Sequence, residues 1–170
     1  MTYQTTPDTS GYARAATLGF VAGLRSMMPF ALLSAAAQRQ GSPAGFAAGQ
    51  PAPLSLLRSR GALVVTGLAA VGELVGDKLP FVPSRTQPGP LGGRIVIGAL
   101  AGAAVCRDAR LNPVLGALLG GATAAGGSYA GAAYRKAATS ATTAPDLVWA
   151  LLEDATALGL GVTALRRYFS

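Results

Sequence analysis

The chain has 170 residues, of which 51% are hydrophobic and only 12% are charged. Soluble domains carry about 25% charged residues, so this composition favours a membrane protein. The absence of histidine excludes histidine-based catalysis and histidine metal sites, and the single cysteine, Cys106, excludes an internal disulfide. The net charge of +7 is spread between apolar segments and forms no basic run, so we expect no nucleic-acid partner.

The N-terminal residues 1–11 are polar and have no basic start, which predicts a short tail and no cleaved signal peptide. Residues 12–170 are predicted to form one transmembrane helical domain. It contains five apolar segments of about 16–25 residues, near the length that crosses a bilayer: 15–38, 60–79, 91–106, 111–134 and 145–165. The predicted fold class is therefore an all-α integral membrane bundle of four to six glycine- and alanine-rich segments, some short or broken.

The first segment contains an arginine, Arg25, in an apolar stretch that Pro29 follows four residues later. Proline has no backbone N–H, so the carbonyl of Arg25 loses its usual helical partner. This predicts a broken helix, at which Arg25 binds an anion or pairs with Glu73. An arginine that reaches toward the membrane interface explains the residue equally well.

The second segment ends in the strongest candidate site, the run Gly72-Glu-Leu-Val-Gly-Asp-Lys-Leu-Pro80. Glu73 and Asp77 are four residues apart and share one helix face, and Lys78 follows at the helix end. In one interpretation the two acids pair with Arg25, Arg94 or Lys78 and fix the helix register. In a second they hold a proton or cation, because carboxylates inside membranes are functional by default. In a third they hold Mg²⁺ against a diphosphate; the metal stays unknown, and no other cofactor is expected.

The connection from residue 80 to 93 is rich in proline and carries Arg85, and Arg94 follows at the start of the third segment. These cations are expected to balance the acids or to meet the phosphate of a lipid headgroup. The last segment contains Glu153 and Asp154, which together cost about 5–7 kcal/mol at a helix centre. Its Leu and Val residues return only about 2.4–4.8 kcal/mol. The two acids must therefore face protein, water or a cation, or one of them must be protonated.

Glycines recur at a spacing of four in these segments, which removes side chains along one stripe and lets helices approach closely. The pairs are Gly19/Gly23, Gly72/Gly76, Gly98/Gly102, Gly116/Gly120 and Gly127/Gly131. A weak internal repeat relates Arg25 and Pro29 to Arg110 and Pro113, each followed by a helix with embedded acids. Repeats with broken helices are typical of transporters.

These motifs resemble a family of small bacterial multi-pass membrane proteins of unknown function. The residues that carry the resemblance are Gly23-Leu-Arg-Ser26, Pro29, Glu73, Asp77-Lys-Leu-Pro80, Pro83, Arg85 and Gly93-Arg94. The resemblance covers about residues 15–135 and implies a location in the bacterial inner membrane. It implies no activity or substrate.

The function that the sequence favours is a small transporter or channel-like protein. Its proton or cation would be carried by Glu73, Asp77, Glu153 and Asp154. Its charge-balancing or anion-contacting residues would be Arg25, Lys78, Arg85 and Arg94. The expected partners are the lipid bilayer and further copies of the chain or other membrane subunits. The alternative is a structural or assembly subunit of a larger membrane complex, and an intramembrane Mg²⁺–diphosphate lipid enzyme is favoured less.

Overall fold

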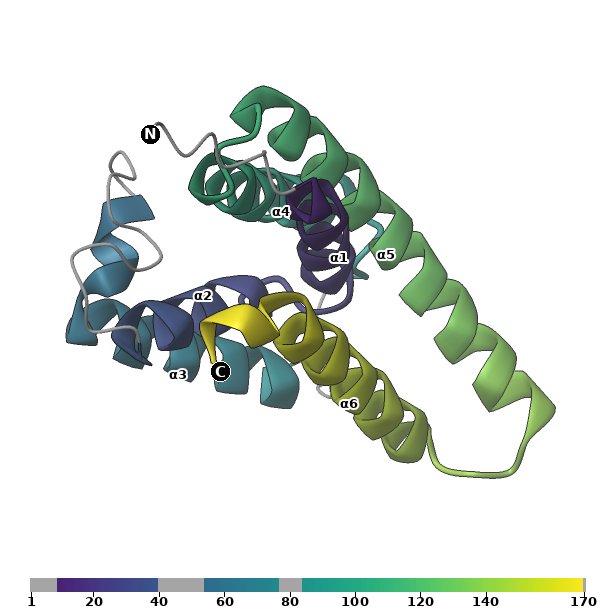
Figure 1. Cartoon of the computed structure of the whole chain (residues 1–170). Coiled ribbons are helices and arrows are strands. Elements are labelled where there is room, and N and C mark those ends of the chain that lie inside the picture. Colours follow the sequence, from purple (N-terminus) through teal and green to yellow (C-terminus); the bar gives the residue numbers. More distant parts are fainter. Residues whose placement is uncertain (1–8, 40–53, 77–83, 170) are drawn as a thin grey trace, which may run out of the picture.

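The computed structural model describes residues 9–39, 54–76 and 84–169, and within these ranges the chain is helical and has no strand (Figure 1). In chain order the elements are α1 (Ser10–Leu24), α2 (Met28–Arg39), the 3₁₀ helix η1 (Leu54–Arg58), α3 (Arg60–Gly76), α4 (Pro88–Asp108), α5 (Pro113–Ala141), α6 (Asp146–Leu165) and the 3₁₀ helix η2 (Arg166–Tyr168).

The centre of the molecule is formed by α1, α4 and α5, which approach one another closely (Figure 1). Between α4 and α5, Gly98 faces Gly120 and Gly102 faces Gly116, so backbone touches backbone where the two helices cross. Gly19 of α1 also lies against Gly120. A side chain at any of these positions would meet a backbone carbonyl of the neighbouring helix, and this is why the helices can come so near.

A tight turn joins α4 to α5. Arg110 takes a left-handed conformation with a φ of 56° and reverses the chain. The Asn112 side chain then accepts hydrogen bonds from the amides of Val114 at 2.9 Å and Leu115 at 3.3 Å, and Pro113 occupies the first helical position. Both features are favourable helix starts. As a result α5 runs antiparallel to α4 and parallel to α1.

The predicted segment 15–38 is broken into two helices. α1 ends at Leu24, Arg25 is extended with φ −141° and ψ 105°, and α2 begins at Met28 next to Pro29. From this break α2 runs away from the central helices and lies beside α3 (Figure 1). The proline therefore has the expected effect, because it sits in the first turn of a new helix, where its missing N–H costs nothing.

Two further elements differ from the sequence-based boundaries. α5 continues to Ala141, so residues 135–141, expected as a polar connection, are helical. They are mostly alanine and basic residues, which are good helix formers. α4 begins at Pro88 and includes Pro90, because prolines are tolerated within a first helical turn. The N-terminal tail is described only from Thr9, and helix α1 already begins at Ser10.

Within the described part of the chain, two helices are long and apolar enough to cross a membrane: α4 and the continuous stretch of α6 and η2. Large apolar side chains point outward from several helices, whereas charged groups lie inside with alanine and a smaller apolar core that includes Leu18, Leu33 and Leu165. The exposed ones include Val64, Val65, Leu68 and Val75 on α3, Val114 and Leu118 on α5, and Leu147, Leu151 and Leu158 on α6. Monomeric soluble proteins rarely expose apolar surface so continuously.

Candidate functional site

Charged side chains from five parts of the chain meet around the break between α1 and α2. We call these six residues the charged layer: Arg25, Glu73, Arg85, Arg94, Glu153 and Asp154. They form three acid–arginine pairs, so three positive charges face three negative charges. The layer is therefore electrically neutral when every carboxylate is ionised.

Glu73, near the end of α3, binds the two backbone amides that immediately precede α2. Its carboxylate accepts hydrogen bonds from the Ser26 amide at 2.8 Å, the Ser26 hydroxyl at 2.9 Å and the Met27 amide at 3.0 Å. The amides at a helix start have no partner within the helix and carry partial positive charge. Glu73 thus caps α2 from a different helix.

Arg94, in α4, binds the other side of the same break. One of its guanidinium nitrogens donates to the carbonyls of Gly23 at 2.8 Å and Leu24 at 2.9 Å, which are the last carbonyls of α1. The other nitrogen donates to Glu73 at 2.9 Å. The Ser128 hydroxyl of α5 also donates to the Gly23 carbonyl, at 3.2 Å. One ion pair therefore satisfies both helix ends that the break creates, where cations favour the C-terminal end and anions the N-terminal end.

Arg25 lies in the break itself and is 1% exposed. Its Nε donates to Asp154 of α6 at 2.5 Å. This contact joins α6 to the end of α1. Charged groups are almost never fully buried without a partner of opposite charge. The Asp154 carboxylate therefore offsets the cost of burying the Arg25 guanidinium.

Glu153, the next residue back along α6, is paired with Arg85 through both carboxylate oxygens. Arg135 of α5 lies 3.6 Å from the same carboxylate and also pairs with Asp146. The pair lies against the bare backbone of Gly131, where a Cβ would meet both the Arg85 guanidinium and the Glu153 carboxylate. Glycine at this position therefore leaves the space in which the pair forms.

A cavity of about 240 Å³ opens beside Glu153. It lies between α1, α5 and α6, and its walls combine apolar groups with the Thr156 hydroxyl and the Glu153 carboxylate. The lining residues are Phe20, Leu24, Ala130, Gly131, Tyr134, Glu153 and Thr156. Glu153 is thus buried within the helices and also borders a space that a small ligand or water can fill.

The structure brings together six of the eight charged residues that the sequence singled out. Asp77 and Lys78 lie outside the described residues. Glu73 pairs with Arg94, one of the partners that the sequence allowed, whereas Arg25 pairs with Asp154 and not with Glu73. Among the residues described, no group of three metal-ligating side chains comes together.

Two contributors escaped the sequence-based reasoning: Ser128 and Arg135. Ser128 lies in an alanine- and glycine-rich helix, where no sequence signal distinguishes it. Ser26 and Gly131 belong to motifs that the sequence analysis named, but their contacts with Glu73 and with the Arg85–Glu153 pair were not predicted. Of the predicted packing glycines, Gly72 and Gly76 have open space where a Cβ would stand, with no neighbour within 4 Å, so they face away from the described part of the chain.

The charged layer lies within a region that a family model covers. This model, described as "Domain of unknown function (DUF4126)", matches residues 13–167. The chain belongs to this family. The match includes all six residues of the charged layer, so the layer is part of the DUF4126 domain. No curated protein and no solved structure matches the chain.

Proposed function

We propose that the chain is a multi-pass protein of the bacterial inner membrane and that its charged layer lies inside the apolar zone. Two observations support this placement. Leu and Val side chains cover the outside of α3, α5 and α6, and α4 and α6 are long enough to span. α1 extends for 15 residues from Ser10 to the break, or about 22 Å, which puts the layer well below the end of the molecule at which α1 begins.

We propose further that the protein is a small proton or cation transporter and that Glu153 carries the ion. The observation behind this is the position of Glu153, a buried carboxylate that borders a cavity. Its partner Arg85 lies in the short non-helical stretch before α4, in a turn that a hydrogen bond from the Gln87 amide to the Ser84 carbonyl closes. Binding of a proton would remove the charge that holds Arg85, so ion binding and the position of this stretch would be coupled.

The role of Glu73 is different in this proposal. Four hydrogen bonds, two of them from backbone amides, already satisfy its carboxylate. Glu73 therefore serves as a structural group. Of the acids that the sequence suggested for the ion site, those of α6, Glu153 and Asp154, are the ones that this proposal keeps. The same four donors disfavour Mg²⁺ binding, because a cation would have to displace a guanidinium and two amides.

Glu153→Gln tests the transport proposal. Purified protein is reconstituted into liposomes, and the decay of an imposed pH gradient is followed with an enclosed pH-sensitive dye, with Na⁺ and K⁺ gradients tested in parallel. We expect wild-type protein to dissipate one gradient and Glu153→Gln to slow this at least about tenfold, because glutamine cannot exchange a proton or balance a cation. Asp146→Asn is the matched control, since Asp146 is exposed and outside the layer. Wild-type fluxes equal to those of protein-free liposomes would contradict the proposal.

One observation favours the alternative, a structural or assembly subunit. α3 has an outward face on which Gly72 and Gly76 meet nothing within 4 Å, beside exposed Val65 and Val75. In a membrane such a face suits close contact with another helix, and the occupant we propose is α3 of a second copy. Light scattering in detergent would then give a dimer that Gly72→Leu converts to monomer, whereas a monomeric wild type would indicate that lipid covers this face.

A further inference from the structure

A second, larger cavity lies far from the charged layer, at the end of the molecule where α1 begins and α6 ends. Its volume is about 460 Å³, within the range of small-ligand sites. Three of its lining residues are arginines, namely Arg14, Arg166 and Arg167, and three carry hydroxyls, namely Ser10, Thr17 and Thr163. Nothing in the proposed ion pathway uses this cavity.

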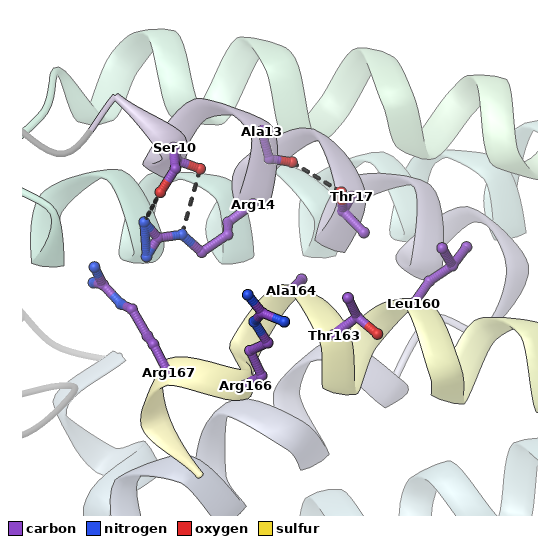
Figure 2. Close-up of a pocket in the computed structure, with 9 residues that line it drawn as sticks. All are labelled: Ser10, Ala13, Arg14, Thr17, Leu160, Thr163, Ala164, Arg166 and Arg167. Atoms are coloured by element: carbon purple, nitrogen blue, oxygen red, sulfur yellow. Dashed lines mark hydrogen bonds between the residues drawn. The ribbon is translucent and has the colours of Figure 1, made fainter. Parts of the chain in front are cut away.

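The three arginines come from opposite walls. Figure 2 shows Arg14 on α1 and, across the gap, Arg166 and Arg167 directed from η2 toward α1. Arg14 is held in place by Ser10, whose carbonyl accepts from Nε at 3.3 Å. Arg167 is held by Asp108 at 2.8 Å and lies over the Tyr168 ring. These two side chains are therefore fixed by neighbours within the fold.

Arg166 differs from the other two. Its side chain is exposed, and among the residues that the structure describes it makes no ion pair. Asp108 pairs with Arg167. Arg166 therefore presents a positive charge to the cavity, which suits a ligand with at least one negative charge.

The remaining three lining residues are apolar. They are Ala13 on α1 and Leu160 and Ala164 on α6, and Leu160 is exposed on the outer surface of α6. The cavity thus places cations and hydroxyls beside a surface that continues along a candidate membrane-spanning helix. A molecule with an anionic head and an apolar tail would satisfy both the charged and the apolar part of the lining.

We propose that this cavity binds the phosphate group of an anionic phospholipid, with the phosphate between Arg14 and Arg166 and an acyl chain along Leu160. The inference uses the proposed membrane placement and is independent of ion transport. Free inorganic phosphate offers the same chemistry to the arginines without the apolar tail. Guanidinium groups bind phosphate oxygens well because they offer paired N–H donors in a plane.

The test is native mass spectrometry of the full-length protein in detergent with added phosphatidylglycerol or phosphatidylcholine, with and without millimolar inorganic phosphate. We expect phosphatidylglycerol adducts to exceed phosphatidylcholine adducts, and Arg166→Gln to reduce them about fivefold. Arg60→Gln, which removes an exposed arginine at the start of α3, is the matched control and should leave binding unchanged. Because Arg166 is exposed, its substitution should not affect folding, and a thermal melt would verify this.

The phosphate arm distinguishes the two sources. If phosphate adducts form and displace the lipid from wild-type protein but not from Arg166→Gln, the site recognises the phosphate group and free phosphate also fills it. Equal adducts with both lipids and no effect of phosphate would overturn the proposal, as would equal effects of Arg166→Gln and Arg60→Gln. Since binding is measured without any flux, a failure here would leave the transport proposal standing, and the reverse also holds.

Discussion

At the scale of single residues, the most informative group is Glu73. Its carboxylate is remote in sequence from the helix that it caps, yet it replaces the local Ser or Asp that usually caps a helix start. Arg94 does the same for the end of α1. The break in the first apolar segment is therefore stable because an ion pair from α3 and α4 satisfies its exposed backbone groups.

We expect Glu73→Gln to destabilise the protein by about 3–5 kcal/mol, because it leaves Arg94 buried without its counter-charge. Glutamine keeps the shape and can still accept from one amide, so the loss reports the charge. The measurement is the midpoint of unfolding by SDS in mixed micelles.

Asp146→Asn provides the comparison for this charge. The Asp146 carboxylate is 58% exposed, and its pair with Arg135 lies at the surface. Surface pairs contribute at most about 1 kcal/mol. If Glu73→Gln and Asp146→Asn lowered the free energy of unfolding by similar amounts, the Glu73–Arg94 pair would contribute no more than a surface pair.

At the scale of helices, glycine positions set how near the elements lie. α5 meets both α4 and α1, and at each crossing the backbones touch without side chains between them. Other glycines of the same helix, such as Gly126, meet nothing within 4 Å. The helix therefore contains both packing glycines and open ones, and sequence spacing alone does not separate them.

Gly120→Ala should weaken the central helices, since its Cβ would meet the Gly98 carbonyl, and an overpacked contact of this kind costs about 1–3 kcal/mol. Gly126→Ala in the same helix should be neutral or stabilise the protein by up to about 1 kcal/mol, because alanine is the better helix former. Thermal melts in detergent compare the two. If Gly126→Ala is the more harmful, the crossing described for α4 and α5 is wrong.

At the scale of the whole molecule, charged groups lie inside and many large apolar side chains lie outside. The interior holds three ion pairs together with alanine and a small set of leucine and valine side chains, and the described helices expose more leucine and valine than they bury. This arrangement is favourable when hydrocarbon surrounds the molecule and unfavourable when water does.

Leu158→Lys on the outer face of α6 distinguishes the two surroundings. In a bilayer, lysine near a helix centre costs about 2.5–3.5 kcal/mol, so less protein should resist alkaline extraction from membranes. In water the same exposed change would alter stability by about 0.5 kcal/mol or less. Thr139→Lys, near the exposed end of α5, is the control and should insert normally. Equal extraction of the two variants would contradict the membrane placement.

Much of this organisation could be predicted from the sequence, and the limits have physical causes. Helix content, the break before Pro29 and the importance of the embedded charges follow from local rules, as does close approach at paired glycines. The pairing of the charges does not, because which arginine meets which acid depends on the rotation of every helix about its axis. For the same reason the spacing of Gly72 and Gly76 predicted a contact but not whether it lies within the chain.

The charged layer also has a consequence for the order in which the chain is made. Arg25 and Arg85 emerge from the ribosome long before Glu153 and Asp154, their partners on the last long helix. Until α6 is synthesised, the growing chain carries two arginines without their counter-charges, and α6 itself contains two acids that oppose its own insertion. The chain before α6 supplies the two arginines, and α6 supplies the two acids that neutralise them. In the proposed membrane placement, these two parts should therefore insert stably only together. A chain cut short before Asp146 would then be a substrate for quality-control proteases, even though most of its helices are complete.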